Sequence, residues 1–107
     1  IETIFAERVN GKFELRRDFT IRKNSNILIV EDVITTGKSS LECSDLILKF
    51  GAKILGYACI IDRSNKKSKI KQKIISQVEI NIPTYEKDNL PKELISIPAI
   101  KPGSRNL

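Results

Sequence analysis

Apolar residues fall into three short runs that predict strands, and the pattern between the first two runs predicts a helix. Residues 27–30 read ILIV, a continuous β-branched run of the kind that forms a strand buried on both faces of a parallel sheet. A second apolar run covers residues 54–61. A third strand is expected from Ile74 or Ile75 to Ile82, where Pro83 ends it.

The segment between the first two runs changes to helical spacing. We expect a helix to begin near Ser39, and Gly51 is suited to end it because glycine accepts the left-handed backbone of a helix C-terminus. A strand, a helix and a strand in this order form a βαβ unit, so the predicted fold is α/β with a Rossmann-like parallel-sheet core. The residues at helical spacing are Leu41, Ser44, Ile47 and Leu48.

The segments on either side of this unit have a different character. Asn10-Gly11 separates two short strand-like arms, and both of these residue types accept positive φ, which predicts a β-hairpin. Beyond Pro83 the tail contains several prolines, the last of them Pro102, and should be mostly irregular. We find no internal repeat and no linker, so one domain is expected. The basic residues of the hairpin are Arg8, Lys12, Arg16 and Arg17.

Composition narrows the chemistry available to this domain. The chain has 107 residues, of which 40% are hydrophobic and 30% charged, which suits one small globular domain or a piece of one. No apolar run approaches the ~20 residues that cross a bilayer, and no signal segment is visible, so a cytoplasmic protein is expected. The two cysteines stand apart and histidine is absent, which excludes imidazole chemistry and leaves only an oxygen-bound hard cation as a metal. The first residue is not Met, so processing or a fragment is expected.

The whole net charge of +6 lies in residues 63–73. This segment, RSNKKSKIKQK, has six basic residues and no acidic one, and the rest of the chain carries 13 of each sign. The run could contact phosphate or nucleic acid, or it could be a solvated surface segment. It contains no aromatic residue for base stacking, which argues against nucleic acid.

The segment most informative about chemistry is ILIVEDVITTGKS, at residues 27–39. The strand brings two adjacent carboxylates, Glu31 and Asp32, to its carboxyl end, where open α/β sheets bind their ligands. The turn at residues 35–39 then leads into a helix, whose first N–H groups and partial positive charge favour phosphate. Gly37 allows the backbone to approach a ligand closely.

A ribose 5-phosphate fits this combination of groups. Its phosphate would lie on the helix end, and its two vicinal hydroxyls would donate to Glu31 and Asp32, which could also stabilise an oxocarbenium-like transition state. The carboxylates could instead merely end the strand and cap the helix. A nucleoside-triphosphate loop is disfavoured, because Asp32 occupies the position of its first glycine.

ILIVEDVITTGKS resembles the phosphoribosyl pyrophosphate (PRPP) signature of the type I phosphoribosyltransferases: an apolar run, an acidic pair and T-T-G-x-S. Other segments resemble bacterial orotate phosphoribosyltransferases in particular. IFAERVNGKFELRRDF is similar to their mobile active-site loop, IIDRS to a strand ending in Asp-Arg, and INIPTYEKDNLP with IPAIKPGSR to their carboxyl tail. The resemblance covers nearly all of residues 1–107 and implies the carboxyl-terminal part of one phosphoribosyltransferase domain that lacks its amino-terminal hood and first strands.

The resemblance implies transfer of a phosphoribosyl group from PRPP to orotate, giving orotidine 5′-monophosphate and pyrophosphate with Mg²⁺ as cofactor, in a cytoplasmic homodimer. No residue is assigned as a direct Mg²⁺ ligand. The implied catalytic residues are Glu31, Asp32 and Lys12, with Arg8 and Lys12 closing over pyrophosphate. Thr35 and Arg63 would bind orotate. The residues implied to bind PRPP are Arg8, Glu31, Asp32, Val33, Ile34, Thr35, Thr36, Gly37, Lys38 and Ser39.

Lys38 departs from the pattern, since the family often has a second glycine there, and it adds a charge to the turn. Two other functions stay open. The chain could act on a different base, or it could be a non-catalytic regulator that keeps the ribose-phosphate pocket and binds nucleic acid through residues 63–73. A sheet begun in the middle of a fold should also have an unpaired edge and bare apolar surface.

Overall fold

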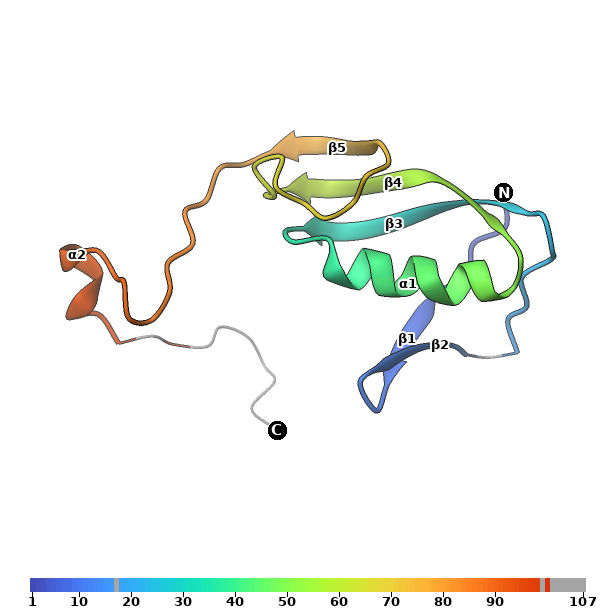
Figure 1. Ribbon diagram of the computed structural model, residues 1–107, viewed down its shortest axis with the longest axis horizontal. Helices are drawn as coiled ribbons and strands as arrows, with labels where there is room; N and C mark the ends of the chain where they lie inside the picture. The colour runs from blue at the N-terminus through green and yellow to red at the C-terminus, as the bar shows by residue number, and fades with distance from the viewer. Residues whose placement is uncertain (17, 99, 101–107) are drawn as a thin grey trace.

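A three-stranded parallel sheet with one long helix forms the centre of the computed structural model, which describes residues 1–16, 18–98 and 100 (Figure 1). The strands lie in the order β3-β4-β5, and α1 connects β3 to β4. An antiparallel hairpin, β1-β2, precedes the sheet. This arrangement confirms the predicted α/β class and βαβ unit. The elements are β1 (Ala6–Val9), β2 (Lys12–Leu15), β3 (Asn26–Ile34), α1 (Lys38–Lys49), β4 (Lys53–Asp62), β5 (Ile74–Glu79) and α2 (Lys92–Ile95).

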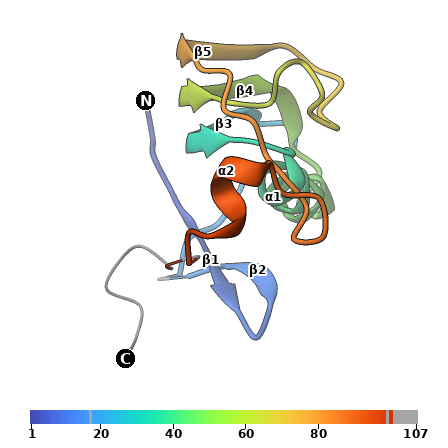
Figure 2. The ribbon, with the colours of Figure 1, turned by 90° about the vertical axis from the view of Figure 1, so that its left-hand side faces the viewer.

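Both strand pairs of the sheet are parallel, so the three strands end at the same edge. Glu31 of β3 pairs with Cys59 of β4, and Asp62 at the end of β4 pairs with Glu79 at the end of β5. Figure 2, turned so that this edge faces the viewer, places α1 to one side of the sheet. The chemistry-bearing residues that follow β3 and β4 are therefore neighbours in space.

The core lies between this sheet and α1. Ile29 and Ile34 of β3, Tyr57 of β4 and Ile47 of α1 are all buried. The helix faces the sheet with Ser40 and Ser44 as well as Ile47, and Leu48 is 51% exposed, so the buried stripe differs from the predicted one at that position. Small serines let the helix lie close to the strands. The buried hydrophobic residues are Ile21, Ile29, Ile34, Ile47, Ala52, Tyr57, Cys59 and Ile70.

The face of the sheet opposite α1 is exposed, and the expectation that residues 27–30 are buried on both sides is wrong for this structure. Side chains alternate along a strand, and α1 covers one face only. Val30 is 70% exposed. β3 is also an edge strand rather than a central one, which agrees with the expected unpaired edge. The large apolar side chains exposed on the three strands are Leu28, Val30, Val33, Leu55, Ile60, Ile75 and Val78.

Two strand ends differ from the sequence pattern. β3 continues four residues beyond Val30, because its residues up to Ile34 pair with β4 up to Asp62. β5 ends at Glu79 rather than Ile82, because Glu79 pairs with Asp62, the last residue of β4. The acidic pair thus lies within β3, not after it.

The hairpin turn is as predicted, with Asn10 at φ 48° and Gly11 at φ 82°. The tail is mostly irregular, apart from the single turn of α2, and Arg17 and Pro102 lie outside the described residues. In the part of the chain that the structure describes, no helix is both long and apolar enough to span a membrane.

Candidate functional site

A cavity of about 130 Å³ opens where β3 ends and α1 begins. It is formed almost entirely by one continuous segment, which includes eight of the ten residues that sequence analysis assigned to PRPP. The exceptions are Arg8 and Asp32. The lining residues are Glu31, Val33, Ile34, Thr35, Thr36, Gly37, Lys38, Ser39 and Ser40.

The turn depends on the glycine at its centre. Gly37 has φ 77°, a left-handed conformation that residues with a Cβ adopt at a cost. A Cβ at this position would lie 2.6 Å from Ser68 Oγ and 2.8 Å from Ile70 Cγ1. Both the backbone conformation and the packing therefore require glycine here.

The first turn of α1 presents hydrogen-bond donors to this cavity. Gly37 is the N-cap and supplies no side chain to cap the helix. The Lys38 N–H donates to Thr36 Oγ1 at 3.3 Å, whereas the N–H groups of Ser39 and Ser40 belong to the turn that has no intrahelical acceptor. With the helix dipole, such donors favour an anion.

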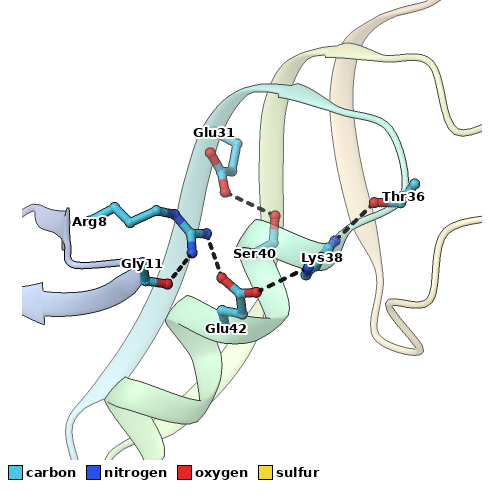
Figure 3. Close-up of polar contacts among 7 residues, drawn as sticks. All are labelled: Arg8, Gly11, Glu31, Thr36, Lys38, Ser40 and Glu42. Carbon is cyan, nitrogen blue, oxygen red and sulfur yellow. Dashed lines mark hydrogen bonds and ion pairs between the residues drawn. The ribbon is translucent and has the colours of Figure 1, made fainter.

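Glu31 is fixed beside these donors (Figure 3). The Ser40 hydroxyl donates to Glu31 Oε1 at 3.1 Å, which joins the strand to the helix across the cavity. Ser40 is only 2% exposed, so this contact is part of the packed interior. Sequence analysis missed Ser40. Its position three residues after the glycine turn, on the sheet-facing side of the helix, was the signal that could have identified it.

The two carboxylates of the acidic pair do not lie together. Glu31 is half-buried at the cavity wall, whereas Asp32 is exposed and is not among the lining residues. Asp32 Oδ1 accepts a hydrogen bond from the Val33 N–H at 2.7 Å. Adjacent residues of a strand point to opposite faces, and this alternation separates the pair.

The hairpin contacts α1 through a charged network beside the cavity (Figure 3). Arg8 forms an ion pair with Glu42 and donates to the Gly11 carbonyl oxygen at 2.7 Å. Lys38 Nζ lies 4.0 Å from Glu42 Oε1, so Glu42 faces both cations. Lys12, beside the hairpin turn, is exposed, and its side chain forms no hydrogen bond or ion pair among the described residues.

Arg63 is brought to the same edge by a backbone contact. Its N–H donates to the Ile34 carbonyl oxygen at 2.9 Å, which places Arg63 next to Thr35. Its Nε is buried and has no hydrogen-bond partner within the described part of the chain. A guanidinium with an unused donor is suited to a planar anion.

The two thiols near the cavity are held in the neutral form. Burial, and then the negative charge of Glu31, raise the pKa of Cys43 above that of a free thiol. Burial raises the pKa of Cys59 as well, with smaller contributions from Asp62 and Glu31. Neither cysteine is therefore suited to act as a nucleophile.

A protein-only metal site is absent from residues 1–16, 18–98 and 100, where no three acidic, cysteine or histidine side chains converge.

A second cavity, of about 220 Å³, lies at the ends of β4 and β5 and was not foreseen from sequence. Its lining residues are Asp62, Asn65, Lys66, Glu79, Ile80 and Asn81.

Comparison with known families agrees with this geometry. The phosphoribosyl transferase domain family matches residues 2–92, a stretch that includes the whole glycine turn. The chain belongs to this family. The match confirms the resemblance inferred from ILIVEDVITTGKS and the type I phosphoribosyltransferase fold class.

Individual relatives of the chain share a more specific name. Over all 107 residues it is 49% identical to the orotate phosphoribosyltransferase of Parvibaculum lavamentivorans, 45% to that of Maricaulis maris and 48% to that of Bartonella henselae. In each case the aligned residues make up 55% of the relative. The chain thus spans about half the length of the curated relatives it matches.

Proposed function

We propose that this chain supplies the PRPP-binding part of an orotate phosphoribosyltransferase, which converts orotate and PRPP to orotidine 5′-monophosphate and pyrophosphate. The observation that carries the proposal is the cavity at the end of β3, where Glu31 faces the glycine turn and the first helical N–H groups. The names of the relatives supply the base, orotate.

The 5-phosphate of the substrate is assigned to the turn at residues 35–39. The free N–H groups of Ser39 and Ser40 and the hydroxyls of the turn would bind its oxygens, and Lys38 would add a positive charge. The Lys38 side chain is 80% exposed, and its Nζ lies 4.0 Å from Glu42 Oε1. Its ammonium can therefore turn toward a phosphate.

Glu31 and Asp32 are assigned to the ribose. Charged acceptors bind the ribose hydroxyls more strongly than neutral ones, and their negative charge stabilises the positive charge that develops on the sugar as pyrophosphate leaves. The Ser40 hydrogen bond supports this role for Glu31, because it fixes the carboxylate at the cavity wall. Asp32 faces away from the cavity and would have to turn from the Val33 N–H toward the sugar to share this role.

Arg63 and Thr35 are assigned to orotate. Orotate is planar and carries a carboxylate, which a guanidinium can bind through two parallel hydrogen bonds. The buried, unpaired Nε of Arg63 and the backbone contact that places Arg63 beside Thr35 support this assignment.

Magnesium fits these residues only as an ion shared with substrate. Mg²⁺ commonly keeps several waters and binds one or two carboxylates together with substrate phosphates, and the described residues gather no larger ligand set. Glu31 is the carboxylate at the cavity wall that would approach it, directly or through water, and Asp32 would first have to turn toward the cavity. When bound, the ion would neutralise charge on the departing pyrophosphate.

Arg8 and Lys12 are assigned to pyrophosphate, with Lys12 as the catalytic candidate of the hairpin. Arg8 would have to exchange its ion pair with Glu42 for the ligand, whereas Lys12 is already exposed. This difference supports a hairpin that moves between α1 and a bound substrate.

We further propose that residues 1–107 are the carboxyl-terminal part of one phosphoribosyltransferase domain that acts in the cytoplasm as a homodimer. The shares of length given above support the first of these statements, since the relatives extend well beyond the aligned region.

The proposed activity is tested by incubating the complete protein with PRPP, Mg²⁺ and a panel of free bases. We expect orotidine 5′-monophosphate and pyrophosphate to form in equal amounts from orotate, with little product from adenine, guanine, hypoxanthine or uracil. Efficient use of a purine instead would favour a different base specificity. Turnover of none of the bases would contradict the proposal.

A further inference from the structure

The connection between β4 and β5, residues 63–73, holds all the net positive charge of the chain, and of its charged residues only Arg63 has a role in the site described above. We call it the basic connection. It contains six basic residues and no acidic one, and it forms neither helix nor strand. A segment of this composition would ordinarily be a solvated loop.

The basic connection is nevertheless attached to the turn at residues 35–39. The Lys69 N–H donates to the Thr36 carbonyl oxygen at 3.0 Å, within the turn itself. Next to it, Ile70 is only 7% exposed and packs at the position that a side chain on Gly37 would occupy. The Ser68 hydroxyl accepts the Ile70 N–H at 3.1 Å and shapes this contact.

Both ends of the basic connection are also held by backbone hydrogen bonds. Arg63 is bonded to Ile34 at the end of β3, and the Lys73 carbonyl oxygen accepts the Tyr57 N–H at 3.1 Å. Figure 2 shows the connection on the same side of the sheet as α1. Its position relative to the cavity is therefore fixed by the fold.

Its charges are exposed and not neutralised. Lys38, Arg8 and Arg16 account for the ion pairs found in the described part of the chain, and none involves the basic connection. The exposed lysines of the segment are Lys66, Lys67, Lys69, Lys71 and Lys73.

We propose that the basic connection is an electrostatic guide that captures the polyanionic substrate and delivers it to the turn at residues 35–39. This inference rests on the proposed function, because it takes PRPP as the ligand of that turn. Fixed charges beside a binding cleft raise association rates roughly 10-fold to 1000-fold at low salt. The field extends over about a Debye length, ~8–10 Å at physiological ionic strength, and Lys69 is hydrogen-bonded to the turn itself.

A nucleic acid is the competing polyanion, and it is disfavoured here. The segment has no aromatic side chain on which bases could stack. It contacts Thr36 and Gly37, which line the small cavity at the end of β3. A guide for a small substrate needs only exposed charge held at the entrance, which this segment provides.

The test compares two triple variants of the complete protein with the same change in net charge. One is Lys67→Gln, Lys69→Gln and Lys71→Gln in the basic connection. The control is Lys23→Gln, Lys49→Gln and Lys53→Gln, at the opposite edge of the sheet. Lys23 precedes β3, Lys49 ends α1 and Lys53 begins β4. The substitutions keep every backbone N–H, including that of Lys69.

We expect the variant of the basic connection to lose roughly fivefold to tenfold in kcat/KM for PRPP at low salt, with a shallower salt dependence. Its kcat and its KM for orotate should stay unchanged, and the control should change less than about twofold. The rate of PRPP association, measured by stopped flow, should fall in parallel. Equal effects in both triple variants, or none in either, would overturn the inference.

The outcomes also separate this inference from the proposed function. An inactive parent protein would refute the transferase proposal, while the PRPP association rates would still decide the role of the basic connection. If an RNA oligonucleotide binds the parent with strong salt dependence and fails to bind the variant, while PRPP association is unaffected, the segment is a nucleic-acid surface and the inference is wrong.

Discussion

The hydroxyl of Ser40, in the first turn of α1, donates a hydrogen bond of 3.1 Å to Glu31 in β3. This contact joins β3 to α1 at the cavity wall and orients a carboxylate whose neighbour in sequence, Asp32, does not line the cavity. The proposed transferase chemistry depends on this orientation, because a charge stabilises a transition state only where it is held in place beforehand.

Glu31→Gln and Asp32→Asn should each lower kcat more than they raise the KM for PRPP. Positive charge on the sugar grows only in the transition state, so the contact is differential. We expect losses of roughly 10-fold to 100-fold in kcat, measured by steady-state kinetics of the complete protein. If both variants raised KM and left kcat untouched, the carboxylates would be uniform binders of substrate.

Gly37→Ala should destabilise the protein more than Gly11→Ala does. Both glycines have left-handed φ, but a Cβ at Gly37 meets Ser68 and Ile70, whereas at Gly11 nothing lies within 4 Å. We expect the strained backbone to lower the free energy of unfolding by about 1–2 kcal/mol at either site. Overpacking at Gly37 should lower it by a further ~1–3 kcal/mol. Urea unfolding of both variants measures the difference, and equal losses would contradict the packing described for the turn.

Arg63→Ala should raise the KM for orotate and leave PRPP binding nearly unchanged. Loss of a charged hydrogen-bond partner costs ~1.5–3 kcal/mol of binding free energy, which corresponds to a KM for orotate raised roughly tenfold to a hundredfold. Arg63→Lys should recover only part of this, since a single ammonium cannot reproduce the planar fork. Steady-state kinetics with each substrate varied in turn is the measurement, and unchanged orotate kinetics would remove most of the case for orotate.

Glu31→Gln should make Cys43 react faster with iodoacetamide at a fixed mildly alkaline pH. Burial and the charge of Glu31 both raise the pKa of this thiol, and the substitution removes the second cause. Asp45→Asn, on the exposed side of the same helix, is the matched control and should leave the rate unchanged. The same raised pKa means that Cys43 contributes stability below about pH 8.5, and that this contribution is lost as the pH rises further. An unaltered rate in Glu31→Gln would show that the carboxylate does not act on Cys43.

The βαβ unit, the hairpin at Asn10-Gly11 and the glycine-containing turn at residues 35–39 were predictable from sequence, because each is encoded locally. Helical spacing, positive-φ residues and an apolar run followed by T-T-G identify elements without knowledge of their partners. Eight of the ten residues assigned to PRPP line one cavity for the same reason: they lie within one short segment, residues 31–39.

The features that escaped prediction depend on contacts between distant segments. Ser40 belongs to the site because its hydroxyl reaches Glu31. Asp32 does not line the cavity because both carboxylates lie within β3, where neighbouring side chains point to opposite faces. The attachment of Lys69 to Thr36 joins residues 33 positions apart in sequence, which no local pattern encodes. Leu48 is exposed because the sheet covers a narrower stripe of α1 than the helical spacing of the apolar residues predicts.

The isolated 107-residue chain should have little or no transferase activity. Val30 and six other large apolar side chains are exposed on the strands, and β3 has an open edge, so part of the pocket and the cover for this face should come from outside residues 1–107. Activity of the isolated chain and of the complete protein is measured side by side. Near-normal activity of the isolated chain would show that these residues suffice.

The most direct test of the account is formation of orotidine 5′-monophosphate by the complete protein and by its Glu31→Gln variant, at saturating orotate, PRPP and Mg²⁺. We expect equal amounts of nucleotide and pyrophosphate from the parent protein. In the variant we expect a kcat roughly 10-fold to 100-fold lower, with PRPP still bound. An unchanged kcat in the variant, or no nucleotide from the parent, would contradict it.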